Sequence, residues 1–207
     1  MPNGIFGYTA LGVSLTMACP LKCEHCITES SPTASAEMTT EEALRYVQDA
    51  EGAIDHISFT GGEPFLKPWR LQACVSEAAK LGYTVSVMTS GYWAKTKEGT
   101  REILTDLKQR GLKFVGVSLD RYHLAYVKED NCIHIAEVCD EIGLHVAVRT
   151  IVAKSDDYGK HVRDILSHTK AQINVNYMVR LGRASGLTQI SFNSSMEPPK
   201  ETCETVT

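Results

Sequence analysis

Three cysteines within eight residues constrain this chain more than any other feature. Cys19, Cys23 and Cys26 follow a short apolar run at residues 11–17, which predicts a buried strand ending in a loop. Three thiolates on one loop can hold three corners of an iron–sulfur cluster, whereas most clusters take four cysteine ligands. A three-cysteine set leaves one iron with an open position, and an open position separates catalytic metal sites from structural ones.

Other uses of the same thiols stay open on spacing alone. A zinc knuckle needs a fourth ligand, and His25 is a poor one because it is adjacent to Cys26. Structural zinc sites usually pair two Cys-x2-Cys units, and the chain has no second unit. The spacing also differs from the ferredoxin run Cys-x2-Cys-x2-Cys-x3-Cys-Pro. Unrelated free thiols are the remaining alternative.

A second motif follows the next apolar run, residues 57–60. Gly61 and Gly62 lack a Cβ and let the backbone approach a ligand closely. Glu63 offers a carboxylate to an ammonium group, and Pro64 stiffens the chain that leaves the motif. Taken alone, Gly-Gly-Glu-Pro is typical of an ordinary loop.

In their order and separation, the two motifs resemble those of the radical S-adenosylmethionine (radical SAM) superfamily, over about residues 11–186. The resemblance implies that Cys19, Cys23 and Cys26 bind a 4Fe-4S cluster whose open iron binds S-adenosylmethionine. It implies that Gly61, Gly62 and Glu63 hold the methionine ammonium of that cofactor. It also implies a reaction: one electron from the reduced cluster cleaves the cofactor, and a 5′-deoxyadenosyl radical abstracts hydrogen. An external one-electron reductant such as ferredoxin or flavodoxin is then expected.

Composition limits the class of protein. The chain has 207 residues, 43% hydrophobic and 22% charged, which is typical of one globular domain. A net charge of −4 gives no electrostatic case for binding nucleic acid or an anionic membrane. Seven cysteines, three of them bunched, favour a reducing compartment over a disulfide scaffold. With no apolar run of 18 residues and no charged-then-apolar leader, a cytoplasmic protein without a membrane span is expected.

Strand and helix patterns alternate along the chain about every thirty residues, the spacing of βαβ units. Strands are predicted at about 11–17, 57–60, 84–89, 113–119, 145–152 and 173–179. Helices are predicted at about 39–50, 69–81, 100–110, 131–142 and 158–168. A closed (β/α)8 barrel typically needs about 250 residues, so six units predict an open, partial (β/α)6 TIM-like barrel. Residues 1–186 would form this core and 187–207 a polar tail, either disordered or a truncated extension.

In parallel barrels the chemistry lies at the carboxyl ends of the strands, and both motifs fall there. Further polar residues share this rim: Thr89, Ser118, Asp120 and Arg149. Thr89 is therefore counted with the cofactor-binding residues. The resemblance implies that Ser118 and Asp120 bind ribose hydroxyls and that Arg149 binds the cofactor carboxylate or ribose. The alternatives are a strand-end turn for the first two residues and a salt bridge for the arginine.

Three ring-bearing residues have two readings each. His25 stands where the family usually has an aromatic residue, and it either stacks near adenine or is solvated. His123 either faces the substrate or lies on the surface. Trp93 either lines a pocket or packs in a loop. The catalytic residues beyond the cofactor site are not identified by the sequence.

The substrate class is suggested by one late motif. Gly182, Arg183 and Ala184 resemble the Gly-Arg-Ala turn of superfamily members with a C-terminal SPASM domain, which mature peptides or proteins. Those members bind auxiliary clusters through many further cysteines, and only Cys203 follows here. We therefore expect either a truncated chain or a minimal core whose site is completed by a partner. The competing functional classes are a non-catalytic iron–sulfur electron-transfer protein and a zinc-stabilised binding module.

Overall fold

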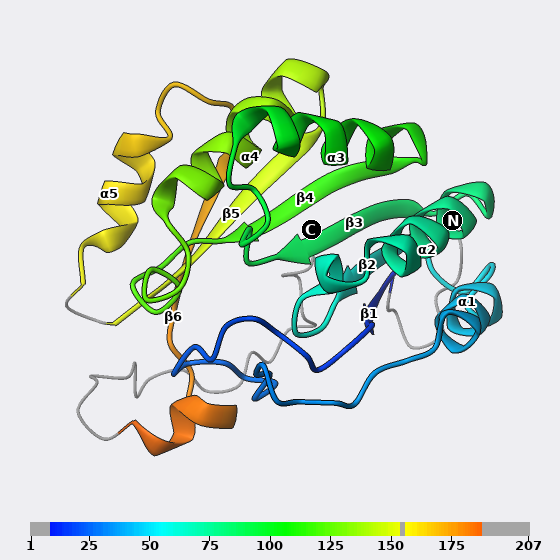
Figure 1. The fold of residues 1–207 in the computed structure, drawn as a ribbon, viewed down its shortest axis with the longest axis horizontal. Helices are drawn as coiled ribbons and strands as arrows, with labels where there is room; N and C mark the ends of the chain where they lie inside the picture. Colours follow the sequence, from blue (N-terminus) through cyan, green and yellow to red (C-terminus); the bar gives the residue numbers. More distant parts are fainter. Residues whose placement is uncertain (1–8, 154–155, 188–207) are drawn as a thin grey trace.

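The fold is a curved sheet of six parallel strands, seen in a computed structural model that describes residues 9–153 and 156–187. The strands lie in chain order: β1 (Ala10–Ser14), β2 (His56–Thr60), β3 (Thr84–Thr89), β4 (Leu112–Ser118), β5 (His145–Val152) and β6 (Gln172–Tyr177). Within the described residues β1 does not pair with β6, so the sheet is an open partial barrel (Figure 1). This confirms the predicted fold class.

Helices alternate with the strands and cover the outer face of the sheet (Figure 1). They are α1 (Thr40–Asp49), α2 (Pro68–Lys80), α3 (Lys97–Gln109), α4 (Glu129–Ile142) and α5 (Tyr158–Ile165), with short 3-10 helices η2 (Pro64–Leu66) and η3 (Gly182–Gly186). A capping box starts α1, because Thr39 and Glu42 each accept from the other's backbone N–H. Thr96 caps α3 and starts it three residues before the predicted position.

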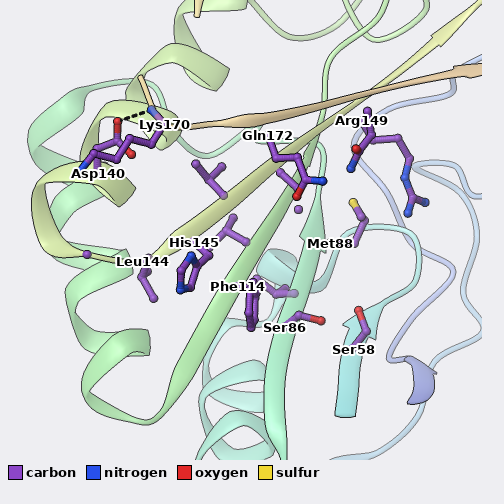
Figure 2. A pocket seen from close by; sticks show the side chains of 17 residues that line it. Ser58, Ser86, Met88, Phe114, Asp140, Leu144, His145, Arg149, Lys170 and Gln172 are labelled. Atoms are coloured by element: carbon purple, nitrogen blue, oxygen red, sulfur yellow. Dashed lines mark hydrogen bonds between the residues drawn. The ribbon is translucent and has the colours of Figure 1, made fainter. Parts of the chain in front are cut away.

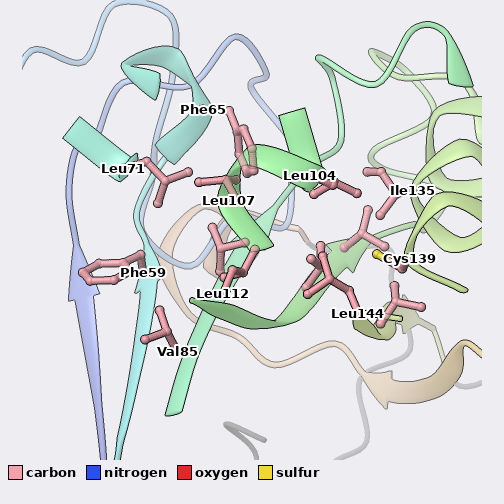
Figure 3. Packing of buried hydrophobic residues seen from close by; sticks show 14 of the residues in the cluster. Phe59, Phe65, Leu71, Val85, Leu104, Leu107, Leu112, Ile135, Cys139 and Leu144 are labelled. Carbon is pink, nitrogen blue, oxygen red and sulfur yellow. The ribbon is translucent and has the colours of Figure 1, made fainter. Parts of the chain in front are cut away.

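Alternation along the strands divides the sheet into an apolar outer face and a polar inner face. Large apolar side chains such as Phe59, Val85 and Leu112 point outward and pack against the helices in one core (Figure 3). Small residues, among them Ser58 and Gly116, border the space inside the curve. Because side chains alternate with a period of two, this pattern leaves the barrel interior hollow for a ligand.

The chain after β1 departs from the predicted strand. The apolar pattern continues to Met17, but the strand ends at Ser14, because β2 ends opposite it at Thr60 and the chain beyond bonds to its own return segment at residues 36–38. Leu15 N–H donates to Thr60 at 2.9 Å, and Met17 N–H donates to Ala36 at 2.7 Å. The cysteine loop therefore begins against β2 and its own return segment.

The structure describes only part of the chain for which a tail, further cysteines and the lack of a membrane span were predicted. Of the predicted tail, residues 188–207 lie outside the described residues. The three cysteines beyond the loop that the structure describes, Cys74, Cys132 and Cys139, are free and buried in the core. Among the described ranges, no helix combines the length and apolar character needed to cross a membrane.

Candidate metal and cofactor site

The three clustered thiols face one cavity of about 250 Å³ at the carboxyl ends of the strands. Cys19 and Cys23 are 8% and 5% exposed, and Cys26 is half-buried. None of them forms a disulfide. The loop is held in place by backbone hydrogen bonds, including one of 3.1 Å from Cys19 N–H to the Ser31 carbonyl. The structure thus brings the predicted cluster ligands together.

The electrostatic setting of these thiols favours a bound cation. Burial raises the pKa of Cys19 to about 12, and the neighbouring thiols and Glu63 add to the rise. Burial also opposes ionisation of Cys26, but hydrogen bonds from Thr28 and the charge of Arg183 bring its pKa below the usual value. Crowded, buried thiolates are costly without a metal to share their charge. An all-sulfur donor set of this kind fits an iron–sulfur cluster.

The glycine pair after β2 packs against the cysteine loop. Gly61 has a φ of +134°, and a Cβ there would lie 2.4 Å from the Thr16 carbonyl oxygen. A Cβ on Gly62 would lie 2.1 Å from the carbonyl oxygen of Ala18. Both glycines border the cavity, but their missing side chains make room for the protein's own backbone. The close approach inferred from sequence is therefore made to the cysteine loop.

Glu63 has a different set of partners from the predicted ammonium. Its carboxylate is fully buried and accepts four hydrogen bonds, from Thr89 Oγ1, Phe65 N–H, Ser90 N–H and Ser90 Oγ. Burial raises the pKa of Glu63 although these bonds oppose the rise. Neither Glu63 nor the buried Pro64, which starts η2, borders the cavity. The glutamate instead ties the ends of β2 and β3 together.

Thr89 borders the cavity, but its hydroxyl is fully engaged. It donates to Glu63 at 2.8 Å and accepts from Gly91 N–H at 3.1 Å and from Trp93 Nε1 at 3.0 Å. Trp93 also stacks on Phe65, with ring centroids 4.3 Å apart, and does not border the cavity. Trp93 therefore packs against its neighbours and does not line the pocket.

Asp120 borders the cavity and is the centre of a buried polar network. Its Oδ1 accepts from Tyr122 N–H at 3.0 Å and His123 N–H at 3.1 Å, and it lies 2.9 Å from His123 Nδ1. Its Oδ2 lies 3.3 Å from His25 Nε2. Although burial opposes it, contact with the two histidines holds the pKa of Asp120 well below its ordinary value. Protein groups therefore surround Oδ1 of this carboxylate, whereas Oδ2 faces only His25.

Both histidines border the cavity, so neither is a solvated surface residue. His25 is 11% exposed, so it is not solvated, and its ring stacks on Tyr122 at 4.7 Å. His123 borders the cavity, and contacts with Asp120 and Cys23 outweigh burial and raise its pKa to about 10. Asp120 Oδ2 and His25 Nδ1 are buried without a hydrogen-bond partner. Buried polar atoms normally have partners, so these two fit a site completed by a polar ligand.

Ser118 and Arg149 also border the cavity, and Arg149 and Met88 border a second one as well. The second cavity, of about 390 Å³, lies inside the curve of the sheet towards the amino ends of β4, β5 and β6. Figure 2 shows the side chains that border this second cavity, with Arg149 and Met88 close together and Phe114 and His145 in another part of the lining. The two rings stack at 4.8 Å. The two cavities are therefore neighbours on the inner side of the sheet.

The sequence draws attention to Arg183 only as part of the Gly-Arg-Ala turn. In the folded chain its contacts place it at the site. It borders the cavity and bonds to the cysteine loop from 160 residues away. The Gly-Arg-Ala turn was the available signal, but only the folded chain shows what the arginine touches.

Comparisons with known proteins agree with this geometry. A family model described as the Radical SAM superfamily matches residues 13–148. The chain is 24% identical over 183 residues to YydG of Bacillus subtilis (strain 168), whose name assigns it to peptide biosynthesis. It is 37% identical over 119 residues to the GTP 3′,8-cyclase of Streptomyces coelicolor (strain ATCC BAA-471 / A3(2) / M145). The crystal structure of methylornithine synthase (PylB) superposes with a TM-score of 0.63 at 13% identity.

These matches cover most of this chain but only part of the relatives. The alignments span 87% of this chain and 57% of YydG, and 54% of this chain and 33% of the cyclase. For methylornithine synthase the shares are 83% and 54%. At 13% identity, that superposition supports the shared fold alone.

Proposed function

The chain belongs to the radical SAM superfamily, whose members use a 4Fe-4S cluster and S-adenosylmethionine, and from this premise we propose its activity. The proposed activity is reductive cleavage of S-adenosylmethionine followed by hydrogen abstraction from a substrate. The observation that carries the proposal is that Cys19, Cys23 and Cys26 face one cavity at the carboxyl ends of the strands. When bound, cluster and cofactor supply a one-electron cleavage that yields a 5′-deoxyadenosyl radical.

The chain's own residues would hold and shield these groups. We assign the three thiols to the cluster. The cofactor would lie against residues that border the cavity: Gly61, Gly62, Thr89, Ser118, Asp120 and Arg149. Glu63 and Pro64 would act indirectly, by fixing the ends of β2 and β3. The fixed walls orient the bound groups and exclude water, and an external reductant would deliver the electron.

Anaerobic reconstitution with iron and sulfide tests this proposal. We expect about four irons per chain, a cluster spectrum, and 5′-deoxyadenosine on addition of reductant and S-adenosylmethionine. The Cys19/Cys23/Cys26→Ala variant should lose both the cluster and the product. A matched Cys74/Cys132/Cys139→Ala variant removes the same number of thiols from the core and should keep the cluster. Zinc in place of iron, or a cluster with no cofactor cleavage, would support one of the competing classes.

We further propose a peptide or protein as the substrate. The name of YydG supports this class, and so does the Gly-Arg-Ala turn. In addition, exposed apolar side chains border the cavity at Ile27, Tyr177 and Val179. An apolar rim suits a partner with side chains to bury, because contact there removes apolar surface from water. Product formation with peptide libraries, compared with small polar metabolites, tests this assignment.

A further inference from the structure

The turn after β6 is hydrogen-bonded to the cysteine loop through one residue. Arg183 donates from Nε to the Cys23 carbonyl at 2.9 Å and from Nη2 to the Ser30 carbonyl at 2.7 Å. Its backbone N–H donates to the Cys26 carbonyl at 3.1 Å. The first and third of these carbonyls belong to two of the assigned cluster ligands. A planar guanidinium suits this task, because its donors point in fixed directions.

Gly182 allows the turn to come this close. Its φ is +54°, and a Cβ there would lie 2.5 Å from the carbonyl oxygens of both Cys26 and Ile27. Any larger residue would push the turn away from the loop. The Gly-Arg pair therefore forms a unit, in which the glycine permits the approach and the arginine makes the bonds.

The cysteine loop needs such support because the sheet is open at this side. Within residues 9–153 and 156–187, β1 and β6 do not pair, and the loop follows β1 at that open edge. The turn spans the opening at the carboxyl rim, where Arg183 takes up three carbonyls of a single loop. Hydrogen bonds from a charged donor are stronger than neutral ones, so this one residue can hold the loop's shape.

We propose that Arg183, placed by Gly182, is a positioning residue that holds the cysteine loop in its cluster-binding shape. The proposal rests on the proposed function in assigning the loop to a cluster. Arg183 acts through the backbone carbonyls of Cys23 and Cys26 and ligates nothing itself. Losing it releases the loop while leaving the core intact.

Residue-resolved alkylation of the cluster-free full chain tests the proposal. Thiol labelling with N-ethylmaleimide, read by peptide mass spectrometry, compares Cys19 and Cys23 with the core thiols Cys74, Cys132 and Cys139. In R183Q we expect labelling of the two loop thiols to speed up about tenfold, because their protection depends on the lost charge-assisted bonds. The core thiols should stay protected.

Three further variants sharpen the result. G182A should act like R183Q, because its Cβ displaces the turn. R183K keeps the charge but loses the fork of donors, so it should show partial protection and serve if R183Q folds poorly. R110Q removes the same charge from an exposed pair with Asp106 and should change nothing.

Two outcomes would overturn the proposal. Unchanged labelling of Cys19 and Cys23 in R183Q and G182A would show that the turn does not hold the loop. A parallel rise at the core thiols would show that Arg183 supports the whole fold. After reconstitution, faster loss of iron to a chelator from R183Q than from R110Q is expected as well. Because the labelling uses cluster-free protein, its result is independent of whether the chain cleaves S-adenosylmethionine.

Discussion

Replacing Glu63 by alanine separates a structural carboxylate from one that binds the cofactor. The substitution removes the acceptor of four hydrogen bonds and leaves the buried N–H groups of Phe65 and Ser90 without a partner. The two hydroxyl donors can rotate to other acceptors, but the backbone groups cannot. Each of these two unpaired N–H groups costs about 1–3 kcal/mol, so the substitution should lower the free energy of unfolding by about 2–6 kcal/mol. The free energy of unfolding of a typical domain is about 5–15 kcal/mol, so this loss of stability is large.

Urea denaturation of the cofactor-free protein measures this loss. Glu102→Ala, on the exposed face of α3, is the control and should change stability by less than about 0.5 kcal/mol. Glu63→Gln keeps the shape but exchanges one acceptor for a donor, so we expect an intermediate loss of about 1–2 kcal/mol. Unchanged stability of Glu63→Ala together with weaker S-adenosylmethionine binding would refute the structural role and restore direct contact with the ammonium.

The pH dependence of Glu63 gives a second check. Its pKa is raised in the folded chain, so its contribution to stability is complete below the unfolded pKa. That contribution is lost as the pH rises through the folded value. Glu63→Gln does not titrate and should lack this part of the pH profile. An identical profile for the two proteins would contradict the raised pKa.

Three other predictions follow from the site and the open barrel. Gly62→Ala should destabilise the protein by about 3 kcal/mol, because its Cβ meets backbone, whereas Gly12→Ala has free space within 4 Å and should be tolerated; thermal unfolding compares them. Asp120→Asn should cost about 3 kcal/mol at neutral pH. Because the pKa of Asp120 is lowered, wild-type stability should fall as the pH falls towards the folded pKa, and the variant's denaturation midpoint should change less. The chain alone should form 5′-deoxyadenosine slowly and without coupled product until a peptide or protein closes the opening between β1 and β6. Fast, coupled turnover of a small metabolite would contradict this last prediction.

Local patterns in the sequence determined the order and type of the elements. Apolar runs and helix caps placed the six strands and five α-helices found in residues 9–153 and 156–187, because strand and helix periodicity are properties of neighbouring residues. The sequence did not predict the end of an element where hydrogen bonds to distant residues determine it. The first strand stops at Ser14 because its partner β2 ends at Thr60 and the chain beyond bonds to a return segment at Ala36.

The grouping of the three cysteines was likewise readable from sequence, because Cys19, Cys23 and Cys26 lie within eight residues, and in the folded chain they border one cavity. The hydrogen-bond partners of the polar side chains at the carboxyl ends of the strands could not be read from the sequence. Glu63 is one residue beyond the cavity lining, and its direction is set by donors on Thr89 at the end of β3 and on Ser90 after it. Arg183 reaches Cys23 from 160 residues away. Sequence spacing fixes which residues share an element, but the direction of a side chain and its distant partners depend on how the elements pack, and that is decided only in the folded chain.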